Sequence, residues 1–129
     1  ARFNEEYTEE MLEAARERAE ELGLEVETVV NVPGTHETPV AAEELLSRED
    51  IDGVVTLGAV IEGATDHDEV IAYNVSKQLL ELSVEHGKPV GMGIIGPGVS
   101  WSQVEKRTEE YARRAVEAAA ETFEELEQV

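Results

Sequence analysis

The stretch that decides the fold is GVVTLGAVI, residues Gly53 to Ile61. The run is almost entirely apolar and rich in Val, and it is far shorter than the ~20 apolar residues that a membrane span needs. Such a run is typical of a central parallel strand that helices cover on both faces. We therefore expect a buried strand here, with a layer of helices on each side of its sheet.

Helical and extended patterns alternate before this run. Apolar residues spaced three and four apart predict a first helix, which Thr8 caps and Gly23 ends. The alternation of Val and polar residues predicts a strand over 25–32. A Thr-Pro pair then predicts the start of a short helix over 38–47.

The same alternation continues after the run. A capping-box spacing at 66–69 predicts a helix that extends to about Glu85. An extended segment is expected over 89–95, and the Gly-Pro-Gly sequence at 96–98 predicts a turn. A second capping pattern at 100–103 predicts the start of the last helix.

This order of elements predicts one α/β domain over residues 1–129. We expect a three-layer α/β/α sandwich with a four-stranded parallel sheet, the flavodoxin-like arrangement. The first of its strands is represented only by a stub at Arg2 and Phe3. Ligands of such sheets bind at the carboxyl ends of the strands, and the segments at those ends are 3–4, 33–37, 58–67 and 96–98.

Two of these segments hold candidate polar groups. Residues 63–67 enter a helix N-terminus, where free N–H groups bind phosphate, although an ordinary capped loop explains them equally well. His67 is the group best suited to proton transfer; the alternative is a local hydrogen bond. Glu37 can accept hydrogen bonds from substrate hydroxyls or amines. Arg107, in the last helix, can bind an anion through two N–H groups or pair with Glu110.

The charge balance excludes several classes of protein. The 129 residues contain 10 Lys and Arg against 30 Asp and Glu, a net charge of −20. Nucleic-acid binding and docking on anionic lipid both need a basic surface. Because 41% of the residues are hydrophobic, the chain is not of the disordered class. We expect a folded domain in a salt-rich cytoplasm, where ions screen its self-repulsion; an acidic protein of ordinary cells is the alternative.

Residue types bound the chemistry further. The absence of Cys excludes disulfides, thiolate catalysis and Cys-bound zinc. The three His residues are scattered and do not have the spacing of metal ligands, so no metal site is expected. No signal peptide or membrane segment is visible, and a cytoplasmic location is the expectation.

Taken together, the motifs resemble the archaeal type of the 6,7-dimethyl-8-ribityllumazine synthase family. The matching segments follow in the right order: RFN (2–4), VPGTHETPVA (32–41), GVVTLGAVIEGATDHDEV (53–70), KPVGMGIIGPG (88–98) and the region of Arg107. The resemblance implies the condensation of 5-amino-6-(D-ribitylamino)uracil with 3,4-dihydroxy-2-butanone 4-phosphate in riboflavin synthesis. It implies no cofactor, and a homopentamer or a shell of pentamers.

The resemblance also implies roles for individual residues. His67 falls on the family's catalytic histidine and Arg107 on its phosphate-binding arginine, while Phe3 falls on the aromatic that stacks on the pyrimidine. The other substrate-binding positions that it implies are Asn4, Gly34, Thr35, His36, Glu37, Ala59, Val60, Ile61, Ala64, Thr65 and Met92. In the pentamer, Met92 and Arg107 would reach the site of the neighbouring subunit.

The sequence departs from the family pattern at a few positions. His36 stands where an aromatic ring is common, Met92 stands where many relatives have Phe, and Arg113 or Arg114 would replace a frequent Lys. Two other functions use the same architecture: the related archaeal riboflavin synthase, which dismutates lumazine, and a non-catalytic flavin-binding module. Incubation with lumazine alone distinguishes the former, and tight riboflavin binding without turnover the latter.

Overall fold

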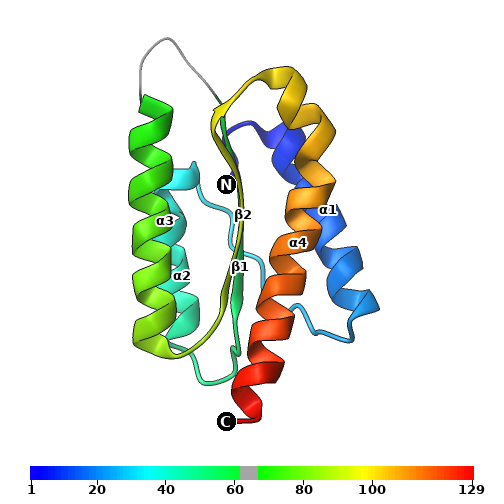
Figure 1. The fold of residues 1–129 in the computed structure, drawn as a ribbon, viewed down its shortest axis with the longest axis vertical. Helices are drawn as coiled ribbons and strands as arrows, with labels where there is room; N and C mark the ends of the chain where they lie inside the picture. The colour runs from blue at the N-terminus through cyan, green and yellow to red at the C-terminus, as the bar shows by residue number, and fades with distance from the viewer. Residues whose placement is uncertain (62–66) are drawn as a thin grey trace.

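The computed structural model describes residues 1–61 and 67–129. Within those residues the elements follow in the order α1 (Glu5–Glu21), a 3-10 helix η1 (Thr35–Glu37), α2 (Thr38–Leu46), β1 (Val54–Ile61), α3 (His67–His86), β2 (Val90–Val99) and α4 (Trp101–Glu127). Figure 1 shows the two strands in the middle, with α1 and α4 on one face and α2 and α3 on the other. The three-layer α/β/α arrangement is confirmed.

The sheet is smaller than expected. β1 and β2 pair in parallel, from Val54 beside Val90 to Ala59 beside Ile95, which confirms the central strand. In the described part of the chain the sheet contains these two strands, so the expectation of four is wrong. Residues 25–32 form no strand, and they line a cavity of about 480 Å³ together with residues of β1. Arg2 and Phe3, which were expected to be the end of a first strand, form no strand either.

Two local expectations are also corrected. α1 begins at Glu5 with Asn4 as its N-cap, so Thr8 is not the cap; its hydroxyl donates to the Glu5 carbonyl within the first turn, at 3.3 Å. The Gly-Pro-Gly sequence at 96–98 does not end its strand. β2 continues through this sequence to Val99. The pairing of β2 with β1 shifts in register there, between Ala59 and Ile61 of β1.

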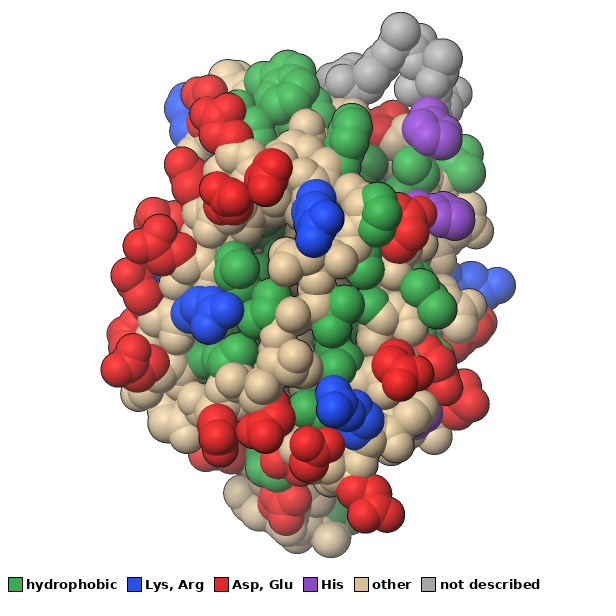
Figure 2. All heavy atoms as spheres, turned by 180° about the vertical axis from the view of Figure 1, so that it is seen from behind, with side chains coloured by type: hydrophobic (Ala, Val, Ile, Leu, Met, Phe, Trp, Pro, Cys, Tyr) green, Lys and Arg blue, Asp and Glu red, His purple; other side chains and the backbone are tan. Residues whose placement is uncertain are grey.

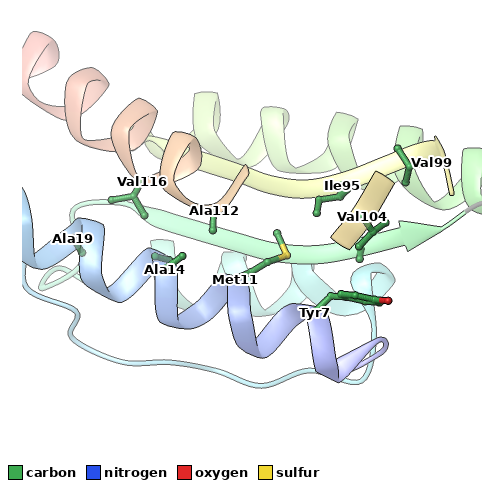
Figure 3. Close-up of a cluster of buried hydrophobic side chains, with 11 residues drawn as sticks. Tyr7, Met11, Ala14, Ala19, Ile95, Val99, Val104, Ala112 and Val116 are labelled. Atoms are coloured by element: carbon green, nitrogen blue, oxygen red, sulfur yellow. The ribbon is translucent and has the colours of Figure 1, made fainter. Parts of the chain in front are cut away.

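The hydrophobic core lies on both faces of the sheet. One cluster joins α1 and α4 to the strands (Figure 3), and Met11, Ile95 and Val104 in it are fully buried. The other cluster joins α2 and α3 to the opposite face around Leu46 and Leu79. Both layers follow from helices that present one apolar stripe to a sheet.

Ion pairs fasten the two helices of the first layer together. Arg18 of α1 binds Glu117 of α4 at 2.9 Å, and Arg113 of α4 reaches back to Glu17 and Glu21, both at 3.2 Å. The predicted capping box of α4 is confirmed at Ser100 and Gln103. Together these contacts hold α4, and with it the segment around Arg107, against α1.

Candidate active site

The N-terminal residues lie across the carboxyl end of β1. The side-chain Nδ2 of Asn4 donates to the carbonyl oxygen of Ala59 at 3.1 Å, and the Phe3 backbone N–H donates to Pro33 at 2.8 Å. Asn4 adopts the left-handed conformation, with φ 64°, which Asn tolerates better than most residues. This turn therefore places Phe3 between the end of β1 and the loop at 33–37.

The loop at 33–37 packs directly on β1 through Thr35. Thr35 is buried, and a Cβ atom on Gly58 would lie only 2.6 Å from its hydroxyl oxygen. Glycine at position 58 is thus required for this close approach. The hydroxyl of Thr38 donates to the Thr35 carbonyl at 2.7 Å, and this bond ties the loop to the start of α2.

Phe3, Gly34 and Glu37 form one surface. A Cβ atom on Gly34 would lie 3.4 Å from Glu37 Oε1 and 3.8 Å from the Phe3 Cβ atom. The Phe3 side chain is 68% exposed, and His36 Nδ1 lies 3.1 Å from Glu37 Oε2. An exposed aromatic ring beside a carboxylate suits a planar ligand that carries N–H or O–H donors.

The end of β1 contributes backbone rather than side chains. Ala59 and Val60 are buried, while Ile61 is partly buried. A Cβ atom on Gly96 would overlap the carbonyl oxygen of Val60, so the second strand end packs against the first. Residues 59–61, which were predicted to border a ligand, thus form the edge of the site through their closely packed backbone.

His67 is exposed and is the first residue of α3. This position carries it at the same end of the molecule as the carboxyl ends of the strands (Figure 1). The predicted phosphate-loop residues Ala64 and Thr65 lie outside the described residues. Sequence reasoning missed the role of the next residue, Asp68, which is buried and accepts a hydrogen bond from the Gly98 N–H at 3.1 Å. Asp68 stands at the start of a helix, where an acidic residue is ordinary, so nothing in the sequence indicated its bond to Gly98.

Arg107 is exposed on α4. The pair with Glu110 that we considered does not form, because Glu110 binds Arg114 at 2.6 Å. Among residues 1–61 and 67–129, Arg107 makes no salt bridge. Arg113 and Arg114 are both engaged in ion pairs within the subunit. Arg107 and its neighbour Lys106 are therefore the cations of this helix that are available to an anionic ligand, and Arg107 is the one that can bind it through two parallel N–H groups.

Met92 does not join the group at the strand ends. It pairs with Thr56 in the middle of the sheet and lines a shallow pocket with α3 residues such as Leu79 and Ser83. The side chain is 44% exposed. Met92 therefore lies apart from the surface formed by Phe3, Gly34 and Glu37 in this subunit.

Two other features bear on the chemistry. In the described ranges, no three His, Asp or Glu side chains are grouped so that they could hold a metal ion. None of the helices described is both long and apolar enough to cross a bilayer.

Comparisons with known proteins give one consistent result. A family model described as 6,7-dimethyl-8-ribityllumazine synthase matches residues 1–127. Proteins of that name are similar to the chain in Staphylothermus marinus (54% identity, 92% of this chain and 79% of the relative) and in Sulfolobus acidocaldarius (50%, 98% and 80%). The protein of Methanothermobacter thermautotrophicus is 44% identical over 99% of this chain and 91% of its own length.

Proposed function

The chain belongs to the 6,7-dimethyl-8-ribityllumazine synthase family, and from that membership we propose how its site works. The enzyme catalyses the riboflavin-biosynthesis step in which 5-amino-6-(D-ribitylamino)uracil condenses with 3,4-dihydroxy-2-butanone 4-phosphate. The products are 6,7-dimethyl-8-ribityllumazine, phosphate and water. The observation that carries our assignment of the site is the surface shared by Phe3, Gly34 and Glu37 beside the end of β1.

The pyrimidinedione binds on that surface in our proposal. The exposed ring of Phe3 stacks on the planar heterocycle, and the Glu37 carboxylate accepts hydrogen bonds from the ribityl hydroxyls. His36 and Thr35 border the same position, and the backbone of 59–61 forms the edge. Thr35 acts through the loop rather than by direct contact, because its side chain is buried against Gly58.

Proton transfer falls to His67. The amine attacks the ketone carbon, and water leaves as an imine forms. Loss of a proton from the hydroxyl-bearing carbon next to the imine expels phosphate and leaves an enol, which tautomerises to a ketone. Attack of the ribitylamino nitrogen on this ketone closes the second ring with loss of water. His67 moves protons in these steps, because an imidazole ring can both donate and accept a proton. Much of the remaining rate enhancement comes from holding the two substrates together.

The phosphate group needs a local cation in an acidic protein. Arg107 is unpaired among the described residues and exposed, and a guanidinium binds phosphate through two parallel N–H bonds. Ala64 and Thr65 are the other proposed phosphate contacts. We propose that Arg107 and Met92 act in the site of a neighbouring subunit.

We propose that the assembly is a homopentamer or a shell of pentamers. An exposed apolar stripe on α3 supports an interface there: its members are Val70, Tyr73, Leu80 and Val84, between 56% and 77% exposed. Their spacing of three, seven and four residues places them along one side of the helix. Sedimentation at about five times the 14.2 kDa subunit mass supports a pentamer; a monomeric enzyme with full activity contradicts it.

The acidic surface supports a further proposal, that the enzyme works in a salt-rich archaeal cytoplasm. The net charge is −20, and Figure 2 shows Asp and Glu side chains over much of the visible face. Repulsion between such charges is reduced when salt shortens the screening length from ~10 Å at 0.1 M to ~3 Å at 1 M.

One assay tests the activity directly. The purified protein is incubated with both substrates, and the absorbance of the lumazine product is followed at low and high KCl. Formation of lumazine supports the proposal. Riboflavin formation from lumazine alone would indicate the related riboflavin synthase. Tight riboflavin binding without turnover of the two substrates would indicate a flavin-binding module.

A further inference from the structure

His36 lies in the middle of a turn whose backbone is anchored on both sides. The Glu37 N–H donates to the Gly34 carbonyl at 3.1 Å, and the Thr38 hydroxyl donates to the Thr35 carbonyl at 2.7 Å. Thr35 itself is buried. The side chain of His36, in contrast, is 75% exposed. The imidazole ring is therefore carried by a fixed turn and remains accessible to a ligand.

The two carboxylate oxygens of Glu37 have different neighbours. Oε2 lies 3.1 Å from Nδ1 of His36. Oε1 is the oxygen that a Cβ atom on Gly34 would approach to 3.4 Å, and the same Cβ atom would lie 3.8 Å from the Cβ atom of Phe3. One oxygen therefore belongs to the surface shared with Phe3 and Gly34, and the other holds the imidazole ring beside that surface.

The contact with Glu37 sets the tautomer of His36. A carboxylate only accepts hydrogen bonds, so the imidazole nitrogen beside it must carry the hydrogen. In the neutral ring the hydrogen is therefore on Nδ1, and Nε2 keeps its lone pair, because the bond made by one ring nitrogen decides the state of the other. Nε2 is thus a hydrogen-bond acceptor on an exposed ring.

The proposed reaction changes the hydrogen-bonding groups of the heterocycle. The amino nitrogen of the pyrimidine loses its hydrogens when it becomes the imine nitrogen, and the ribitylamino nitrogen loses its own when the second ring closes. Both nitrogens are donors in the substrate, and neither carries a hydrogen in the lumazine. A surface that offers acceptors therefore fits the substrate better than the product.

We infer, on the basis of the proposed function, that His36 is a specificity-determining residue that selects the ribitylaminouracil substrate over the lumazine product. Its Nε2 accepts a hydrogen bond from a substrate N–H that the product lacks, and Glu37 orients the ring. A site built to hydrogen-bond an N–H group discriminates against a ligand without that group, because the acceptor then loses water and gains no partner. The product is therefore released more readily than the substrate.

A protonated His36 is the competing arrangement. Both ring nitrogens would then donate, so the ring would favour the product, whose nitrogens accept. The two arrangements differ in the sign of their effect. Removal of a neutral, accepting ring lowers the preference for the substrate, whereas removal of a protonated ring raises it.

Binding measurements test the selection. Calorimetry gives the dissociation constant of the pyrimidine, without the butanone phosphate, and that of the lumazine. We expect the ratio of the lumazine constant to the pyrimidine constant to fall about fivefold in His36→Phe, which corresponds to the loss of one neutral hydrogen bond. His36→Gln keeps an acceptor oxygen and should recover part of the ratio. His86→Phe, at the far end of α3 (Figure 1), is the matched control and should leave the ratio unchanged.

Nitrogen NMR shifts of the imidazole test the tautomer without any ligand. We expect the neutral ring of His36 to carry its hydrogen on Nδ1 in the parent chain and to lose this preference in Glu37→Ala. A neutral ring with its hydrogen on Nε2 in the parent chain would overturn the inference, because no acceptor would then face the ligand.

The binding ratios can overturn the inference in other ways. An unchanged ratio in His36→Phe, or equal ratios in His36→Phe and His36→Gln, would show that the acceptor does not select the substrate. A ratio that rises in His36→Phe would indicate the protonated ring. Failure of the proposed function is a separate result, in which the parent chain forms no lumazine from the two substrates.

Discussion

The buried carboxylate of Asp68, at the start of α3, accepts a hydrogen bond from the backbone N–H of Gly98, near the end of β2, at 3.1 Å. Asp68 is only 8% exposed, and its neighbour in the chain is His67. The bond therefore links the helix turn that carries the proposed proton-transfer group to the end of the second strand.

Breaking this link should loosen the position of His67. In Asp68→Ala the Gly98 N–H loses its charged acceptor, and we expect a cost of about 1–3 kcal/mol in the free energy of unfolding and a fall in kcat. Asp68→Asn keeps an acceptor oxygen and should recover much of both. Urea unfolding and steady-state kinetics measure the two effects; identical behaviour of the Ala and Asn variants would contradict the link.

Replacing His67 should affect chemistry and leave the fold intact. His67 is exposed, so His67→Ala removes little packing, but it removes the proposed proton-transfer group. We expect kcat to fall by about 10²–10⁴-fold, the range typical of general acid–base catalysis, with the sedimentation coefficient unchanged. Glu69→Ala, two residues along the same helix turn and also exposed, is the control. Full activity of His67→Ala when chemistry limits the rate would disprove the role.

Arg107 should matter for one substrate more than for the other. Arg107→Ala removes the guanidinium from the proposed phosphate contact, and we expect a larger rise in KM for the butanone phosphate than for the pyrimidine. Lys106→Ala is the matched control, since it removes a neighbouring positive charge. Steady-state kinetics with each substrate varied in turn gives the comparison; equal changes in the two KM values would rule out a phosphate-specific role.

The link between α2 and α3 should fail in acid. His86 Nε2 lies 2.7 Å from Glu43 Oε2, and this hydrogen bond lowers the pKa of Glu43 from its ordinary value of 4.5. A carboxyl group with a lowered pKa in the folded state stabilises the fold above its unfolded pKa, and this contribution is lost as pH falls through the folded pKa.

The melting temperature of the parent chain should therefore drop more steeply below pH 4.5 than that of Glu43→Gln, which lacks the titrating group. Melting curves recorded from pH 7 downward test this. Parallel pH profiles of the two proteins would mean that the pair does not contribute.

Salt should stabilise the protein. With 30 acidic against 10 basic side chains, the folded state concentrates negative charge, and screening reduces the repulsion. We expect the melting temperature to rise between dilute buffer and molar KCl. A flat or falling melting temperature would remove the proposal of a salt-rich habitat and would leave the enzyme assignment unaffected.

Local patterns predicted those elements that depend on local interactions. The run at 53–61 became β1, and the capping pattern at Ser100 and Gln103 became the start of α4. The start of α1 was misplaced because Thr8 and Asn4 are both acceptable caps, and the contact of Asn4 with Ala59 favours the latter. Glu37 was predicted from its place in the loop at 33–37, and Phe3 and Gly34 from family positions; the structure brings the three together. Asp68 was not found, because its partner lies 30 residues away.

The sequence by itself determined the helices, the central strand, the acidic surface and the family. The helices and the strand follow from the spacing of residues, the acidic surface from composition, and the family from the order of the motifs. Only the tertiary structure decided whether an extended segment becomes a strand. Residues 25–32 have the alternation of a strand, but a strand needs backbone partners within hydrogen-bonding distance, and a cavity of about 480 Å³ lies between these residues and β1. The contacts of Asp68 with Gly98 and of Thr35 with Gly58 have the same origin. Distant parts of the chain supply the partners of these buried polar groups, and only the fold brings them into contact.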